Sequence, residues 1–355
     1  MLKEISGGVC AAKGFRAAGV RCGVKSKVAA GDGNQPVVPS MKDYLTGKKD
    51  LAMILSDCDC SAAAVYTMNR VKAAPIYVTM GNLEDGVCRG VIANSGNANA
   101  CAPHGEENAE KMCAAAAKAI GCAPEDVLVS STGVIGQTIN VKVIEDGVPE
   151  LYGLLERSDE ASDAAAHAIM TTDTTKKEFA AEVFIGGTAV HIGGIAKGSG
   201  MIHPNMGTML CFLTTDCAIS QEMLTEALHE VVRMTFNRIS VDGDTSTNDT
   251  CCILANGMAG NAEITEKNDR YVDFVMALHE VCYLLARSMA KDGEGAKHLI
   301  TCSVRGAACG EQAETISKSV ISSTLTKAAI FGCDANWGRV LCAMGYSGEK
   351  FDPEK

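Results

Sequence analysis

The sequence has few aromatic residues and no cluster of basic residues, and each absence excludes a class of partner. Aromatic residues make up 5% of the 355 residues, which disfavours the stacking surface of a single-stranded nucleic-acid binder. Lysine and arginine total 32 against 43 aspartate and glutamate, so the net charge is −11. Without a basic patch, a nucleic-acid partner is not expected.

Long apolar runs and cysteine motifs are missing as well. No uninterrupted apolar run approaches the length of a transmembrane helix, and the N-terminus lacks the apolar core of a signal peptide. The 17 cysteines are odd in number and scattered, with no Cys-x-x-Cys, so they resemble neither a disulfide framework nor a zinc site. We therefore expect a soluble cytoplasmic protein with reduced thiols and no membrane partner.

Motifs for common cofactors and metals are also absent. No phosphate loop occurs, and Gly198-Ser199-Gly200 has His203 where a third glycine would complete a dinucleotide fingerprint. The acidic run Asp242–Asp249 departs from a calcium loop, so we expect an ordered turn whose side chains bond backbone amides. The histidines are dispersed, and no Gly-x-Ser-x-Gly marks a serine hydrolase. Neither a metal nor a cofactor is expected.

What the chain does contain is a series of short apolar strands interrupted by helices. This rhythm predicts a layered α/β protein with mixed sheets covered by helices. A glycine pair, Gly186-Gly187, predicts a two-residue hairpin loop between Phe179–Ile185 and Thr188–Ile195. Helices are predicted at Glu106–Ile120, Glu160–Met170, after the capping residue Ser220, at Tyr271–Ala290 and at Ser317–Ala329; further strands are predicted at Leu51–Ser56, Ala62–Tyr66, Val87–Ala93, Val127–Val129, Cys251–Leu254 and Leu299–Val304.

One stretch, Lys197–Asp216, passes through turn formers to Gly207-Thr208 and then becomes apolar. It places the Thr208 hydroxyl at the start of a buried strand, where a nucleophile would be useful; an ordinary loop-to-strand junction is the alternative. Thr132-Gly133 would present successive amides to an oxyanion, unless it is a plain turn. Lys197 would bind a carboxylate, unless it is a solvated lysine.

Together with these residues, a set of motifs in a fixed order resembles the ArgJ family of ornithine acetyltransferases, also called glutamate N-acetyltransferases. The resemblance covers essentially the entire chain. Its motifs are Gly7-Gly8-Val9 with Lys13–Val20, Asn94–Cys101, Ser131–Gly136, Ala168–Thr174, Lys197–Asp216, Val241–Asp249, Asp292–Ala296 and Asp334–Arg339.

The resemblance implies a fold and a processing event. The implied fold is a layered α-β-β-α sandwich like that of ArgJ and DmpA, with a smaller C-terminal lobe. The implied event is self-cleavage of the Gly207–Thr208 bond into an α chain, 1–207, and a β chain, 208–355. The family's nucleophile maps to Thr208, and its oxyanion stabilisers map to Thr132 and Gly133.

The resemblance also implies an activity in arginine biosynthesis. A ping-pong cycle moves the acetyl group of N-acetylornithine to the Thr208 hydroxyl and then to glutamate, and some members accept acetyl-CoA as donor. The family's substrate contacts map to Lys197, Thr208, Glu294 and a threonine of the 171–175 turn, Thr171 in preference to Thr172. The implied assembly is a heterotetramer of two α and two β chains.

The chain departs from the family at three places. Gly207 replaces the usual alanine, and Ala102-Pro103 replaces the usual Thr-Gly. The sequence ends soon after Gly345–Gly348, before the C-terminal substrate contacts of the family, so a truncated C-terminus is expected. Two other functions stay open at this point. One is an N-terminal-nucleophile aminopeptidase or amidohydrolase of related fold, and the other is an uncleaved, non-catalytic binding protein.

Overall fold

The computed structural model describes residues 2–25, 48–203 and 209–353. Gly207 and Thr208, the predicted cleavage site and nucleophile, lie outside these ranges. Within them, the strands form one mixed sheet in the order β1-β6-β7-β8-β9-β3-β4-β5, with β2 also paired to β3. The strands are β1 Lys3–Ile5, β2 Phe15–Val20, β3 Leu51–Tyr66, β4 Val87–Asn97, β5 Val127–Val134, β6 Lys177–Ile185, β7 Thr188–Lys197, β8 Leu210–Thr215 and β9 Thr250–Ala255.

The long strand β3 joins the two halves of this sheet. Its first part, Leu51–Ser56, pairs with β2, and its last part, Ser61–Tyr66, pairs with β9. Strands β4 and β5 are parallel, as are β8 and β9, and the other pairs are antiparallel. The two strands predicted at Leu51–Ser56 and Ala62–Tyr66 are therefore parts of one element.

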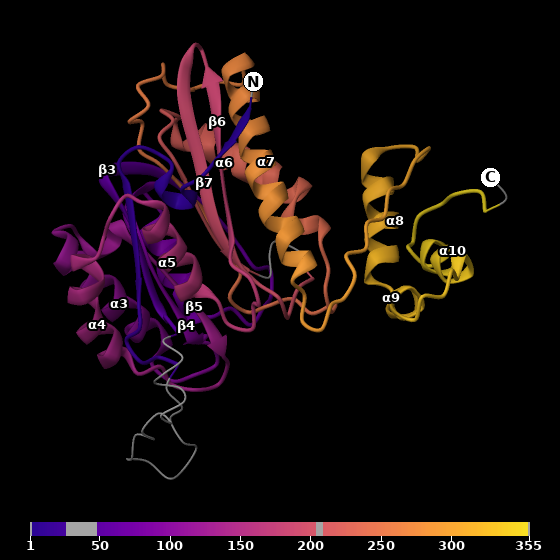
Figure 1. Ribbon diagram of the computed structural model, residues 1–355, viewed down its shortest axis with the longest axis horizontal. Helices are drawn as coiled ribbons and strands as arrows, with labels where there is room; N and C mark the ends of the chain where they lie inside the picture. Colours follow the sequence, from indigo (N-terminus) through magenta and orange to yellow (C-terminus); the bar gives the residue numbers. More distant parts are fainter. Residues whose placement is uncertain (1, 26–47, 204–208, 354–355) are drawn as a thin grey trace, which may run out of the picture.

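Helices cover the outer face of each half, as Figure 1 shows. Helices α3 and α4 bury their apolar sides against β2 to β5, and α6 and α7 do the same against β6 to β9. Helix α5 packs into a third apolar cluster, which takes side chains from both halves of the sheet. The predicted mixed α/β fold of sheet layers covered by helices is confirmed. These helices are α3 Gly105–Ile120, α4 Val141–Gly153, α5 Asp159–Ile169, α6 Gln221–Met234 and α7 Asp269–Lys291.

Three further helices form the smaller C-terminal lobe, which stands apart from the layers in Figure 1. They are α8 Gly310–Ser322, α9 Thr324–Phe331 and α10 Trp337–Gly345. The lobe joins the main body through the 237–241 segment, whose carbonyls accept hydrogen bonds from two lysines of the lobe. Lys318 Nζ donates to the carbonyls of Asn237 at 2.6 Å and Ile239 at 2.9 Å, and Lys327 Nζ donates to the carbonyl of Val241 at 2.5 Å.

Local sequence signals explain several element ends. Gly186 and Gly187 have φ values of 56° and 87°, which the hairpin turn requires and which glycine adopts without a side-chain clash. The Ser220 hydroxyl accepts a hydrogen bond from the amide of Met223, so it caps α6 as predicted. Gly121, at φ 84°, ends α3 in the left-handed conformation that a helix C-terminus favours.

Other sequence predictions were wrong because a local pattern does not reveal its partner. Residues 299–304 form no strand, since no described strand pairs with them. The helix predicted at Ser317–Ala329 breaks at Ser323, whose hydroxyl caps α9. Gly8–Cys10 forms a 3-10 turn. Three helices have no counterpart in the sequence prediction: α2 Ala74–Asn82, α4, which has Pro149 in its interior, and α10. No helix in the described ranges is both long and apolar enough to cross a membrane.

Candidate active site

One cavity of about 500 Å³ collects the predicted site residues that the structure describes. It lies where β5 and β7 end and β8 begins, next to the loop that follows α7 and the turn that precedes β9. Segments far apart in the sequence therefore meet here. Among its lining residues are Thr132, Gly133, Thr171, Thr172, Lys197 and Glu294.

Thr132 and Gly133 lie in the last part of β5, paired with β4 in parallel register, and not in a turn. A side chain at Gly133 would place its Cβ 2.3 Å from the carbonyl carbon of Gly96 and 2.5 Å from the amide nitrogen of Asn97. Because Gly133 also has φ of 134°, the close strand pairing there requires glycine. Asn248 fixes the same strand end by donating a 2.8 Å hydrogen bond to the Ser131 carbonyl.

Lys197 is buried at the end of β7, with 8% of its surface exposed, so it is not a solvated lysine. Its Nζ donates to the hydroxyls of Thr171 at 2.8 Å and Thr132 at 3.2 Å. Burial lowers the pKa of Lys197, and nearby Asp173 opposes that shift. The ammonium is thus held in place by two hydroxyls rather than neutralised by an ion pair. An anionic group entering the cavity would supply the missing counter-charge.

The structure distinguishes the two threonines that the motif left unresolved. Thr171 hydrogen-bonds to Lys197, whereas the Thr172 hydroxyl shares a 2.8 Å hydrogen bond with the Ser199 hydroxyl. Both residues line the cavity. Thr171 therefore belongs to the Lys197 group, and its role in substrate binding stays a prediction.

A buried ion network supports this side of the cavity. Lys177 Nζ lies 2.6 Å from Asp173 and 2.5 Å from Asp292, and none of its side chain is exposed. The Asp173 carboxylate also accepts hydrogen bonds from the amides of Thr171 at 3.0 Å and Gly198 at 2.7 Å. The Asp173 carboxylate thus positions two backbone segments near Lys197: the 171–175 turn and the residue that follows Lys197.

Glu294 brings a carboxylate to the cavity from the loop after α7. Its amide donates to the Ser199 carbonyl at 2.8 Å, which ties this loop to the end of β7. A Cβ on Gly200 would lie 2.5 Å from the Glu294 Oε1, so a side chain there would displace the Glu294 carboxylate. The cavity therefore carries a cation, Lys197, and an anion, Glu294, from separate segments.

Comparison with known proteins decides the family. The model of the ArgJ family matches residues 38–355. This chain belongs to the ArgJ family.

Individual relatives agree with this assignment. The arginine biosynthesis bifunctional protein ArgJ of Symbiobacterium thermophilum is 49% identical over 99% of this chain and 83% of its own length. The glutamate N-acetyltransferase of Methanocaldococcus jannaschii is 42% identical over 99% of this chain and 81% of its own.

Two solved structures are similar over part of the chain. A crystal structure of ArgJ from Bacillus halodurans is 38% identical with a TM-score of 0.51, and it covers 58% of this chain and 98% of the solved chain. An ornithine acetyltransferase from Mycobacterium tuberculosis, solved with ornithine, is 35% identical with a TM-score of 0.50, covering 58% of this chain and 99% of the solved chain.

Two charged residues of this ArgJ-family cavity were missed from the sequence. Lys25 lines the cavity, and its Nζ donates to the carbonyls of Lys49 at 2.7 Å and Met170 at 2.9 Å. Burial lowers the pKa of Lys25 to about 8.

Asp249 also lines the cavity, with 1% of its surface exposed. Because Asp249 ends the acidic run Asp242–Asp249, its sequence position predicts only a role in the turn. Asp242 does fill that predicted role, accepting from the amides of Met201, Ile202 and Asp244.

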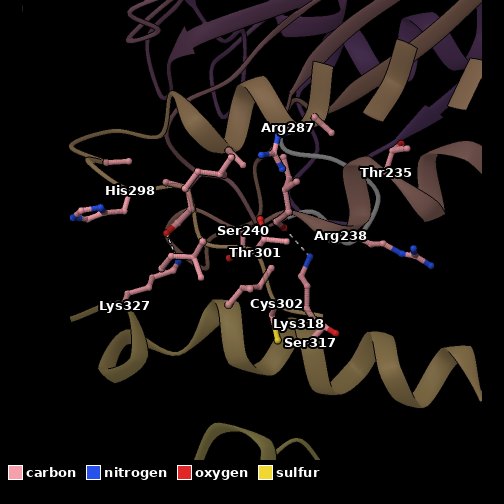
Figure 2. A pocket seen from close by; sticks show the side chains of 18 of the residues that line it. Thr235, Arg238, Ser240, Arg287, His298, Thr301, Cys302, Ser317, Lys318 and Lys327 are labelled. Atoms are coloured by element: carbon pink, nitrogen blue, oxygen red, sulfur yellow. Dashed lines mark hydrogen bonds between the residues drawn. The ribbon is translucent and has the colours of Figure 1, made fainter. Parts of the chain in front are cut away.

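A second, larger cavity of about 770 Å³ lies between α7 and the C-terminal lobe of the ArgJ-family chain. Figure 2 shows Lys318 and Lys327 entering it from the lobe, opposite Arg287. Of the predicted site residues that the structure describes, this cavity touches Glu294 and none of the others. The predicted site residues that the structure describes therefore gather in the smaller cavity.

Proposed function

We propose that this chain transfers the acetyl group of N-acetylornithine to glutamate through an acyl intermediate on Thr208. One observation carries the proposal: the family's substrate and oxyanion positions, scattered from residue 132 to residue 294, line a single cavity. The names of the relatives, an arginine biosynthesis bifunctional protein and a glutamate N-acetyltransferase, support the same reaction.

The charges of the cavity suit an amino-acid substrate. The buried Lys197 ammonium would bind the substrate α-carboxylate, since a charge-assisted hydrogen bond gains strength where water is excluded. The Glu294 carboxylate would bind an ammonium group of ornithine. Both N-acetylornithine and glutamate carry an α-carboxylate, so one cation can serve both half-reactions.

The transfer itself needs a nucleophile, a base and an oxyanion site. The Thr208 hydroxyl attacks the acetyl carbonyl, and its proton passes to the α-amine of Thr208. The oxyanion forms against Thr132 and Gly133, and the proton leaves with the ornithine amine. The amine of glutamate then attacks the acetyl ester, which releases N-acetylglutamate and regenerates the hydroxyl.

The free α-amine requires cleavage of the Gly207–Thr208 bond into 1–207 and 208–355. The Thr208 hydroxyl would attack the Gly207 carbonyl, and water would hydrolyse the ester to leave a carboxylate on Gly207 and an amine on Thr208. Chain lengths among the relatives support this. The two solved chains are covered almost fully by 58% of this chain, and 58% of 355 residues is about 206.

The wider setting follows from the family and from the thiols. We propose assembly as two α and two β chains, with no cofactor and with acetyl-CoA as an alternative acetyl donor. All 17 cysteines are free thiols, which supports a reducing compartment such as the cytoplasm.

Intact mass and labelled acetyl transfer test the proposal together. The wild-type chain should separate into two segments under denaturing conditions and should move labelled acetyl from N-acetylornithine to glutamate. Thr208→Ala should abolish both cleavage and transfer, while Thr175→Ala, at an exposed site outside the cavity, should abolish neither. Cleavage or transfer by Thr208→Ala would refute the nucleophile. Release of acetate at equal rates with and without glutamate would instead indicate a hydrolase.

A further inference from the structure

The two half-reactions of the proposed function require substrates whose side chains carry opposite charges. N-acetylornithine and glutamate share an α-carboxylate, but the side chain of N-acetylornithine ends in an ammonium and that of glutamate ends in a carboxylate. A ping-pong enzyme binds both in turn at the same cavity. Lys197 would bind the shared α-carboxylate, and Glu294 would bind the ornithine ammonium. The glutamate side chain therefore calls for a further cation.

Lys25 brings a second positive charge to the smaller cavity, which it lines together with Lys197. Its side chain crosses Gly96, where an added Cβ would lie 2.7 Å from the Lys25 Cγ. The buried Asp50 carboxylate fixes the backbone at this point, because it accepts hydrogen bonds from the amides of Gly23 at 3.1 Å and Lys25 at 3.0 Å. Lys25 is thus held in place by contacts with distant parts of the chain.

The Lys25 ammonium retains a donor for a ligand. Its hydrogen bonds to described residues go to two neutral groups, the carbonyls of Lys49 and Met170. An ammonium has three N–H donors, so one is left. Burial lowers the pKa of Lys25 to about 8; the charge of Asp50 opposes this shift and the charge of Lys197 adds to it. At neutral pH the group is still mostly protonated and can bind an anion.

The two ammonium groups of the cavity contact consecutive residues. Lys25 Nζ donates to the carbonyl of Met170, and Lys197 Nζ donates to the hydroxyl of Thr171. The Cα atoms of adjacent residues are about 3.8 Å apart, so both cations border one short segment. Such a pair suits a small dicarboxylate, whose two charges are separated by a short aliphatic chain and would offset the repulsion between the lysines.

We propose that Lys25 binds the side-chain carboxylate of glutamate and so selects glutamate as the acetyl acceptor. The inference rests on the proposed function. In the first half-reaction, Glu294 binds the side-chain ammonium of N-acetylornithine. In the second, Lys25 binds the side-chain carboxylate of glutamate. Lys197 binds the α-carboxylate in both, so one cavity accepts two substrates of opposite side-chain charge.

The replacement Lys25→Met, made in the full chain, tests this assignment by comparing two acceptors. Incorporation of labelled ornithine into N-acetylornithine reports transfer to ornithine, and formation of N-acetylglutamate reports transfer to glutamate. Loss of a hydrogen bond between charged groups should lower kcat/KM for glutamate, relative to kcat/KM for ornithine, about tenfold to a hundredfold. The loss should appear mainly as a higher KM for glutamate, because the bond already forms in the bound ground state.

Two further variants separate ligand binding from support of the fold. Lys49→Met removes a lysine that also donates to a backbone carbonyl, that of Gly19 at 2.8 Å, but whose side chain does not line the cavity. This control should leave the ratio between the two acceptors unchanged. Lys25→Arg keeps the positive charge and should retain most of the preference for glutamate. An unchanged ratio in Lys25→Met, or an equal fall in Lys49→Met, would overturn the inference.

Glutamine as acceptor provides a test on the wild type that does not depend on the folding of variants. Glutamine has a neutral amide in place of the side-chain carboxylate, so its kcat/KM should be about tenfold or more below that of glutamate. In Lys25→Met the two values should lie close together. Equal values in the wild type would overturn the inference. If the wild type transfers acetyl to neither ornithine nor glutamate, the proposed function itself fails, and the two failures are thereby distinguished.

Discussion

Lys177 holds a buried positive charge between two carboxylates, and its replacement by methionine tests how the cavity is supported. In Lys177→Met, Asp173 and Asp292 keep their negative charges but lose the ammonium at 2.6 Å and 2.5 Å. Removing one partner of a buried ion pair costs about 3–5 kcal/mol, because the remaining charge is left uncompensated in a region of low polarity. We expect the free energy of unfolding to fall by that amount.

The adjacent surface lysine provides a matched control. Lys176 contacts Asp163 and Glu178, but 39% of its side chain is exposed. Surface ion pairs contribute about 0–1 kcal/mol, so Lys176→Met should change the free energy of unfolding by no more than that. Urea unfolding, in the uncut Thr208→Ala background so that one chain is measured, compares the two variants. Equal losses for both would refute the argument that burial decides the effect.

The pH dependence of the Lys177→Met effect provides a second check. Burial alone would raise the pKa values of Asp173 and Asp292. The pKa of Asp173 is instead lowered by the charges of Lys197 and Lys177. The pKa of Asp292 is lowered by its contacts with Lys177 and Thr174. A carboxylate with a lowered folded pKa contributes stability above its unfolded pKa of about 3.9 and loses it as pH falls through the folded value. The unfolded chains of wild type and Lys177→Met titrate alike, so the difference in stability between them should shrink as pH falls from the higher carboxyl pKa values of the folded variant to the lowered ones of the folded wild type.

Three further outcomes are expected. Gly133→Ala should abolish acetyl transfer, because the added Cβ would lie 2.3 Å from a backbone atom of the neighbouring strand. The control Gly136→Ala has open space around it, so it should lose about 1–2 kcal/mol of stability and keep its activity. Equal activity of the two variants in enzyme assays would contradict the strand-pairing argument. Burial lowers the pKa of Lys318 to about 8, so the folded chain releases this proton before the unfolded chain does, and stability should rise with pH between about 8 and 10.4 in urea titrations. In Lys318→Met that rise should be reduced. A thiol reagent should label exposed cysteines of the native chain far faster than buried ones, as peptide mass would show, and the exposed cysteines are Cys101, Cys309, Cys333 and Cys342.

Local elements of the fold were predictable where a short-range signal decides the structure. A glycine pair sets the β6–β7 hairpin, Ser220 sets the start of α6, and Gly121 sets the end of α3, because each acts through backbone atoms only a few residues away. Strand assignments were poorer, since a strand exists only with a partner. Residues 299–304 have the apolar pattern of a strand without a partner strand. In contrast, β4 and β5 continue beyond the strands predicted at 87–93 and 127–129, because they pair with each other.

By itself, the sequence determined the family and the identity of the predicted site residues, because motifs in a fixed order mark positions without reference to space. The tertiary structure decided what those positions share: one cavity, a buried Lys197 and a hydrogen bond that distinguishes Thr171 from Thr172. It also brought Asp249 from the acidic run into that cavity. Burial and pairing of charges depend on segments far apart in the chain, and those segments meet only when the sheet has formed.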